Sequence, residues 1–196
     1  MTDSAATTEG HRPLRVLTVC SHNRTRSVMM AAMFEQGLGA RLGADRVLVQ
    51  SAGFGPPGLP AIADAVAAMG RRNLDVSAHR SQQVTADLVQ GVDVVLTAER
   101  DHVVKIAALS PQAFRYSMTM PEFLRLASGL PSGNSQGLTD WLQSLTADRS
   151  ASAYLRADVD EINDPTGSAA RVFERAVVEL EQQCAETAQL LCGALR

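Results

Sequence analysis

Short apolar segments alternate with longer segments of helical pattern, and this alternation constrains the fold of the chain more than any other feature. The apolar segments are rich in β-branched residues, as strands are, and helical segments separate them. Strands are expected at residues 15–19, 47–50, 93–97 and 114–118, and helices at 27–38, 60–71, 99–109, 121–127 and 169–195. Such alternation predicts an α/β protein, a three-layer sandwich with a four-stranded parallel sheet and helices on both faces.

The 196 residues suit one compact domain. Residues 1–13 are polar and are expected to be a flexible N-terminal arm, and residues 14–196 a single domain. Within it, the segment at about 120–160 is extended, and its part at 128–138 holds Gly, Ser, Pro and Asn, which are typical of a loop. This segment is expected to be an insertion that supplies a lid or a pocket wall.

The charge balance and the cysteines exclude several classes of protein. The chain has 18 basic and 21 acidic residues, a net charge of −3, which argues against binding to nucleic acid or to an anionic membrane surface. Three cysteines are too few, and odd in number, for a secreted disulfide scaffold. Because no apolar stretch approaches the ~18 residues of a membrane span, and no signal peptide is evident, a cytoplasmic protein is expected.

The most informative segment lies between the first expected strand and the first expected helix. It has the form C-x5-R-S, from Cys20 to Ser27. Ligands of open α/β sheets bind at the carboxyl ends of the strands, where this segment falls. A tight loop at a helix N-terminus binds phosphate through its backbone N–H groups, and Arg26 can grip two oxygens with its planar guanidinium. The residues expected to line the phosphate site are Ser21, His22, Asn23, Arg24, Thr25 and Arg26.

The residue types in this loop point to nucleophilic catalysis. The positive surroundings favour a thiolate, so Cys20 is expected to be ionised and to attack phosphorus, forming a phosphocysteine. Ser27 can donate to the thiolate, and it is also a candidate N-cap of the helix. Asp164 precedes Pro165 in a turn that holds it extended, from which it can protonate the leaving oxygen and later activate water. These steps need no metal and no organic cofactor.

The chain resembles the low-molecular-weight protein tyrosine phosphatases, whose fold the thioredoxin-coupled arsenate reductases share. Five segments match in order along most of the chain, and they are residues 16–27, Ser51–Gly53, Ser77–Ser81, 93–100 and Asp164–Pro165. Five ordered matches are far more specific than C-x5-R alone.

The resemblance implies a fold and a set of roles. The fold is a parallel sheet of strand order 2-1-3-4, and residues 14–196 would be one phosphatase-like domain. Cys20 would be the nucleophile, Arg26 the phosphate clamp, Ser27 the thiolate partner and Asp164 the general acid and base. Asn23, Ser51 and His79 would support the loop, with Asn23 in a left-handed conformation. The implied reaction is hydrolysis of phosphotyrosine protein or small aryl phosphate esters.

Partners follow from the same resemblance. A phosphorylated protein or a small phosphate ester would be the substrate, and relatives in bacteria point to a tyrosine kinase of polysaccharide synthesis. A monomer or a weak dimer is expected.

The sequence also departs from the family. Thr166 and Gly167 follow Asp-Pro where the family usually has an aromatic residue, which weakens the case for phosphotyrosine. Thr25 replaces the second cysteine that often precedes the arginine, and Arg24 suggests a second anionic or polar group on the substrate.

Two alternatives stay open at this point. Arsenate fits the same loop, but a reductase needs further thiols, and residues 98–110 contain no cysteine, so an external thiol would be required. Cys184 and Cys192 are eight residues apart on an expected helix, too far to pair unless the helix breaks. The other alternative is a weakly catalytic phosphate-binding module, for which Cys20 and Asp164 would have no purpose.

Overall fold

The computed structural model describes residues 12–129 and 137–195. Its four strands form one parallel sheet, in which the order is β2-β1-β3-β4. The strands are β1 (Leu14–Cys20), β2 (Val47–Gly53), β3 (Val94–Thr97) and β4 (Ser117–Thr119). The expected α/β fold with order 2-1-3-4 is confirmed.

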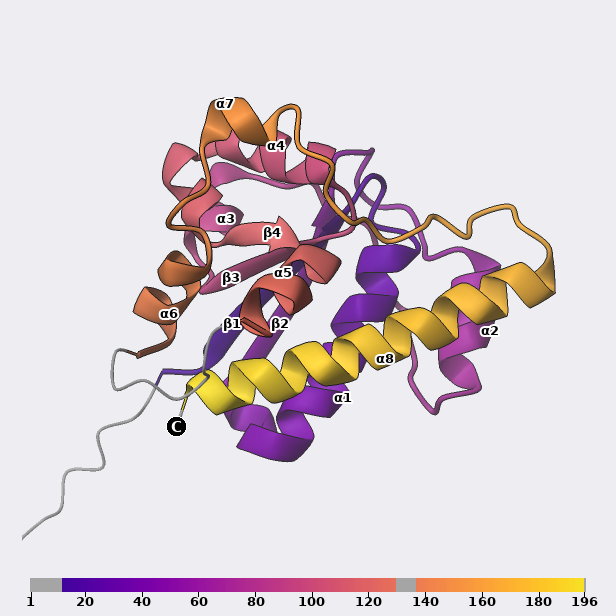
Figure 1. Ribbon diagram of the computed structural model, residues 1–196. Coiled ribbons are helices and arrows are strands. Elements are labelled where there is room, and N and C mark those ends of the chain that lie inside the picture. Colours follow the sequence, from indigo (N-terminus) through magenta and orange to yellow (C-terminus); the bar gives the residue numbers. More distant parts are fainter. Residues whose placement is uncertain (1–11, 130–136, 196) are drawn as a thin grey trace, which may run out of the picture.

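Helices cover both faces of this sheet, which completes the three layers (Figure 1). They are α1 (Arg26–Leu42), α2 (Ala63–Gly70), α3 (Ala86–Gln90), α4 (Arg100–Leu109), α5 (Met120–Ala127), α6 (Gly137–Leu145), α7 (Ala151–Tyr154) and α8 (Ala170–Ala194), and there are 3-10 turns at Ala44–Arg46 and Pro111–Arg115. Helices α1, α2, α5 and α8 pack on one face, and α3 and α4 on the other.

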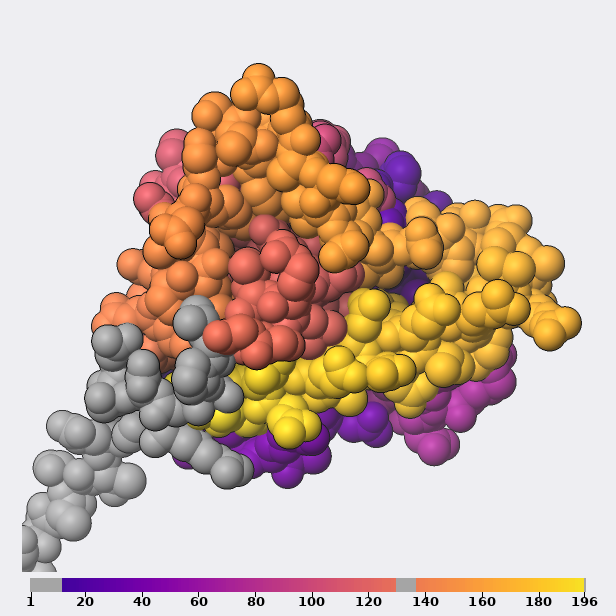
Figure 2. Space-filling model, in the orientation of Figure 1, coloured from indigo at the N-terminus to yellow at the C-terminus, as the bar shows by residue number. Residues whose placement is uncertain are grey.

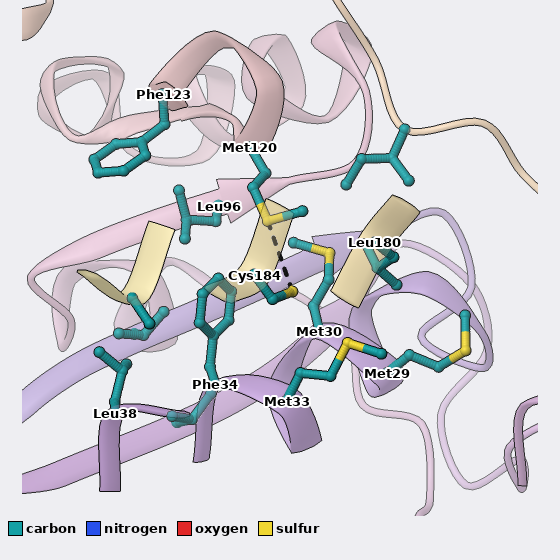
Figure 3. Close-up of a cluster of buried hydrophobic side chains, with 14 of the residues drawn as sticks. Met29, Met30, Met33, Phe34, Leu38, Leu96, Met120, Phe123, Leu180 and Cys184 are labelled. Carbon is teal, nitrogen blue, oxygen red and sulfur yellow. Dashed lines mark hydrogen bonds between the residues drawn. The ribbon is translucent and has the colours of Figure 1, made fainter. Parts of the chain in front are cut away.

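The strands are apolar on both sides because both faces of the sheet are covered. Successive strand residues point to opposite faces, so Val16 belongs to the core beneath α1 and α8 while Leu17 belongs to the core beneath α3 and α4. The larger core is shown in Figure 3, where Phe34 of α1 and Leu180 of α8 lie among buried methionines. Figure 2 shows α8 and the segment at 137–165 on either side of α5 on one face of the molecule.

Two sequence expectations differ from the structure. The fourth strand was expected at 114–118, but residues 111–115 form a 3-10 turn that begins with Pro111, and the strand is only Ser117–Thr119. The turn is consistent with the fixed φ of proline, which suits the start of a helical turn. The loop expected at 128–138 ends in helix: α6 begins at Gly137 because its apolar face, with Trp141 and Leu142, is buried.

Some expectations lie outside the described residues. They are the flexible arm, for residues 1–11, and the loop at residues 130–136. Among residues 12–129 and 137–195, no helix is both long enough and apolar enough to cross a membrane.

Candidate functional site

The loop of residues 21–25 turns directly from the end of β1 into α1. Its first residue is held by the backbone of the neighbouring segment, because the N–H groups of Phe54 and Gly55 donate to the carbonyl of Ser21 at 2.8 and 2.9 Å. Gly53 permits this close approach, since a Cβ there would lie 2.6 Å from the nitrogen of Asn23. The loop is therefore fixed from outside as well as by its own sequence.

Asn23 anchors the middle of the loop. Its φ is 53°, the left-handed conformation that the family resemblance implied and that asparagine tolerates better than most residues. Its side chain points away from the pocket, where Nδ2 donates to Ser51 Oγ at 2.9 Å and Oδ1 accepts from the backbone of Gln82 at 2.9 Å. His79 Nε2 donates to the Asn23 carbonyl at 2.8 Å. Asn23, Ser51 and His79 are thus brought together as a brace behind the loop.

Ser27 contacts the sulfur of Cys20. The two atoms, Ser27 Oγ and Cys20 Sγ, are 3.0 Å apart, and Asn23 Nδ2 donates to the same hydroxyl at 3.0 Å. Because the hydroxyl oxygen of Ser27 accepts a hydrogen bond from Asn23, the hydroxyl proton of Ser27 is available to donate to the sulfur of Cys20. The expectation that Ser27 caps the helix is wrong: α1 begins at Arg26, Thr25 is at the N-cap without a side-chain cap, and the Ser27 hydroxyl is committed to the thiol.

Arg26 is almost fully buried at the base of the pocket, with 3% of its side chain exposed. Nη1 donates to the carbonyl of Ile162 at 2.8 Å, and Nη2 lies 3.0 Å from Asp164 and 2.6 Å from Glu99. Nε is buried and has no hydrogen-bond partner among the described residues. A buried donor without a partner is costly, which makes Nε a group that a bound oxyanion would satisfy.

Asp164 reaches the loop from the turn before α8. Its side chain is 44% exposed and lies against Arg26, and its Oδ1 accepts from the backbone N–H of Thr166 at 3.0 Å. Partial burial raises the pKa of Asp164, but hydrogen bonds from Thr166 and the charges of Arg26 and His22 outweigh burial, so the pKa lies below its ordinary value. The carboxylate is therefore ionised at neutral pH.

These groups surround one cavity of about 310 Å³. Most of the residues expected to bind phosphate line it: the cavity wall consists of Cys20, Ser21, His22, Arg24, Thr25, Arg26, Ile62, Asp164 and Thr166. Asn23 does not line it, because its side chain belongs to the brace. Nor do the described residues of the 120–160 segment, so the lid or wall expected from them is not found at this cavity.

Sequence reasoning missed three residues of the site, namely Ile62, Glu99 and His102. Ile62 forms an apolar wall, and its N–H donates to the carbonyl of Arg24. Glu99 pairs with Arg26, and His102 lies 3.1 Å from the Ser21 hydroxyl. Glu99 and His102 follow β3 directly, at the same edge of the sheet as the loop after β1. Because ligands bind at this edge, their position in the sequence could have identified them as residues of the site.

The remaining cysteines are remote from this chemistry. Cys184 and Cys192 are buried within α8, which is continuous from Ala170 to Ala194, and burial raises the pKa of Cys184. Among the described residues there is no cluster of three or more His, Cys, Asp and Glu side chains suited to a metal ion. The donors at the cavity are N–H groups and a guanidinium, a set that suits an oxyanion.

Comparison with known proteins places this geometry in context. A probable low molecular weight protein-tyrosine-phosphatase, EpsP, from Ralstonia nicotianae is 39% identical over 85 residues, which are 43% of this chain and 54% of that protein. The chain therefore spans about half the length of this curated relative.

Solved structures are similar over more of the chain. The YwlE arginine phosphatase from Geobacillus stearothermophilus has a TM-score of 0.67 and 26% identity, over 90% of this chain and 92% of that one. A low molecular weight protein tyrosine phosphatase from T. tengcongensis has a TM-score of 0.65 and 25% identity, over 88% and 96% of the two chains. The model of the low molecular weight phosphotyrosine protein phosphatase family matches residues 15–129, and the chain belongs to this family.

Proposed function

We propose that this protein is a cysteine-dependent phosphatase that hydrolyses phosphate monoesters through a phosphocysteine. The observation that carries the proposal is that Cys20, Arg26 and Asp164 line one cavity while Ser27 contacts the sulfur of Cys20 from behind it. Residues 14–196 act as one phosphatase-like domain in this proposal. It is supported by the position of Asp164, which lies beyond the matched range and still contacts Arg26.

The first step transfers the phosphoryl group to the enzyme. The Cys20 thiolate attacks phosphorus, the ester P–O bond breaks, and Asp164 gives its proton to the leaving oxygen. In the structure Asp164 is paired with Arg26. An arriving phosphate dianion engages the guanidinium and repels the carboxylate, and both effects raise the pKa of Asp164 towards the protonated form that the step requires.

The second step returns the enzyme to its starting state. Asp164, now a carboxylate, takes a proton from water as the water attacks phosphorus. The S–P bond breaks, inorganic phosphate leaves, and the Ser27 hydroxyl stabilises the thiolate that departs. The proton that Asp164 took from water is then released to solvent, and the carboxylate pairs with Arg26 again.

The cavity wall indicates the substrate. Ile62 offers an apolar surface to an aryl group, but Thr166 stands where an aromatic wall would hold phosphotyrosine, and it contacts Thr25 at 3.1 Å. Arg24 uses Nε to donate to the carbonyl of Pro60, and the described residues provide no ion pair for its guanidinium. The favoured substrate therefore carries a second anionic group beside the phosphate, as an acidic phosphopeptide does.

The finer parts of the proposal concern the substrate, the partner protein, the cellular location and the oligomeric state. The substrate is a phosphorylated tyrosine protein or a small aryl phosphate, and a tyrosine kinase of polysaccharide synthesis is the proposed partner. The enzyme works in the cytoplasm as a monomer or weak dimer, without nucleic acid or membrane. The family resemblance and the net charge of −3 support these assignments.

Turnover of para-nitrophenyl phosphate tests the proposal. The wild-type protein is expected to hydrolyse it, with competitive inhibition by vanadate. Cys20→Ser should abolish turnover and still bind inorganic phosphate, whereas Cys184→Ser, at a buried thiol in α8, serves as the matched control and should keep activity. Turnover in Cys20→Ser at the wild-type rate would contradict the nucleophile assignment.

Two other outcomes would redirect the assignment. Phosphate binding without hydrolysis would identify a binding module, and reduction of arsenate with added thiol would identify a reductase. Phosphoarginine is a further substrate to compare, since one similar structure is described as an arginine phosphatase. Arg24 lines the cavity, and because the described residues provide no ion pair for its cation, it disfavours a substrate that bears its own guanidinium.

A further inference from the structure

Ser21 and His102 form a contact that the proposed steps do not use. Ser21 directly follows the nucleophile and lines the cavity. His102 lies in the first turn of α4, with only 1% of its surface exposed. Nε2 of His102 is 3.1 Å from Oγ of Ser21, although the two residues are 81 positions apart. A buried imidazole thus reaches the phosphate loop from the neighbouring strand–helix connection.

The other ring nitrogen fixes the direction of this hydrogen bond. The backbone N–H of Glu99 donates to Nδ1 of His102 at 3.1 Å. A nitrogen that accepts carries no proton, so the proton of the neutral ring is on Nε2, which donates to Ser21 Oγ. A doubly protonated ring would set Nδ1–H against the N–H of Glu99, two donors facing each other.

The surroundings keep the ring neutral and fix its plane. Phe54 stacks on it, with 5.8 Å between centroids and 16° between planes. Burial lowers the pKa of His102 to about 4; the charges of Arg26 and Lys105 also lower it, and those of Glu99 and Asp101 oppose them. At neutral pH the imidazole therefore remains a fixed donor.

The consequence falls on the hydroxyl proton of Ser21. The oxygen accepts from His102 and has no other partner among the described residues, so its proton is free to point into the cavity. Ser27 shows the same arrangement on the other side of the nucleophile, where Asn23 donates to its oxygen and its proton faces Cys20. In both cases a buried donor directs a hydroxyl.

We propose that His102 is a positioning residue that turns the Ser21 hydroxyl into an additional donor to the bound phosphoryl oxygens. Ser21 then acts beside the loop N–H groups and Arg26, and the contribution of His102 passes entirely through Ser21. The proposal rests on the proposed function where turnover is concerned, but it also determines the affinity of the loop for inorganic phosphate.

A double-mutant cycle tests this coupling. The variants are Ser21→Ala, His102→Leu, their combination and His102→Gln, whose amide can replace the Nε2 donor. Ser110→Ala, at the far end of α4, is the matched control. The readouts are kcat/KM for para-nitrophenyl phosphate and the dissociation constant of inorganic phosphate.

The expected result is non-additive. Ser21→Ala and His102→Leu should each lower kcat/KM and phosphate affinity by roughly tenfold or more, the size of one hydrogen bond to a charged group. The double variant should be no worse than Ser21→Ala, His102→Gln should regain most of the loss, and Ser110→Ala should match wild type. A purely structural role for His102 would persist in the Ser21→Ala background.

Two results would overturn the proposal. One is a Ser21→Ala protein with wild-type kcat/KM and phosphate affinity; the other is a double variant in which the two losses multiply. If His102→Leu fails to fold, Ser21→Ala and His102→Gln decide the question. If the wild type binds phosphate without turnover, the proposed function fails and the binding constants still decide, whereas a loop that binds no phosphate overturns both.

Discussion

At the scale of single residues, the site depends on how a few charges are paired before substrate arrives. Arg26 is shared between Asp164 and Glu99 and retains one buried N–H without a partner among the described residues. Asp164 is ionised in that state, although its proposed first task is to donate a proton. The charge of the substrate itself is therefore part of the proposed mechanism.

The leaving group should reveal the proton donor. In Asp164→Ala, turnover of phenyl phosphate should fall by about 10²–10⁴-fold, the usual share of acid–base catalysis. Turnover of para-nitrophenyl phosphate should fall less, because nitrophenolate leaves readily without a proton. Measured kcat values for the two esters check this, with Asp158→Ala, an exposed carboxylate, as the control. Equal losses for both esters would argue against a general acid at this position.

Arg24 should discriminate between substrates by charge. Arg24→Gln is expected to raise KM for an acidic phosphotyrosine peptide by several-fold and to leave KM for para-nitrophenyl phosphate nearly unchanged, because only the peptide offers a second anion. Exposed ion pairs are worth roughly 0–1 kcal/mol, which limits the effect to about fivefold. The same steady-state measurements on Arg80→Gln, an exposed arginine outside the cavity, provide the control. A matching rise for both substrates would count against the proposed subsite.

At the scale of elements, the nucleophile depends on the meeting of three strand–loop connections. The loop after β1 has its backbone bonded to the segment after β2, and its left-handed residue is held by side chains of Ser51 and His79. The segment after β3 adds Glu99 and His102. Each connection is polar and irregular, and the sheet keeps them in register.

Gly53→Ala should disrupt this meeting. Its Cβ would lie 2.6 Å from the nitrogen of Asn23 and 2.8 Å from the carbonyl oxygen of Cys20, both backbone atoms, so the loop must shift. Because a small displacement of the loop N–H groups that bind phosphate slows catalysis strongly, kcat/KM should fall by about 100-fold or more. Gly70→Ala, whose Cβ meets nothing within 4 Å, should retain activity. Full activity in Gly53→Ala would show that the loop tolerates displacement.

At the scale of the whole molecule, stability is tied to buried polar groups as well as to the apolar core. The guanidinium of Arg149 lies over the rings of Phe114 and Tyr154 and contacts Glu122, and these residues join α5, α7 and the segments around them. Burial lowers the pKa of Arg149 and raises that of Tyr154. Residues 122, 149 and 154 thus pack together through a buried polar network, and none of them lines the cavity.

Stability should decrease as the pH falls from about 6.5 to about 4. The pKa of His102 is 6.5 in its ordinary state and about 4 in the folded protein, so in this window the unfolded chain binds a proton that the folded chain does not. The free energy of unfolding should drop by at most about 3 kcal/mol from this residue. Urea denaturation across this pH range measures it. His102→Gln should reduce the slope, and an unchanged slope would contradict the prediction.

The sequence alone determined the features that depend on neighbouring residues. The spacing of apolar residues and the local composition indicated the strands and helices. The motif C-x5-R-S at a strand–helix junction indicated the phosphate loop, because turn geometry and backbone donors are local properties. The turn Asp164–Pro165 indicated the general acid, and the family resemblance added the brace of Asn23, Ser51 and His79. The boundary of β4 and the helix at Gly137 were missed, since a short strand and an amphipathic segment depend on the surface against which they pack.

Only the tertiary structure decided which distant residues meet. Arg26 and Asp164 are 138 positions apart, and Ser21 and His102 are 81 apart, and no local pattern encodes either contact. Parallel strands bring the loops that follow them to one edge, but the side chains that touch there depend on register and on helix packing. For that reason the nucleophile was evident from seven residues, whereas the partners that position it required the whole fold.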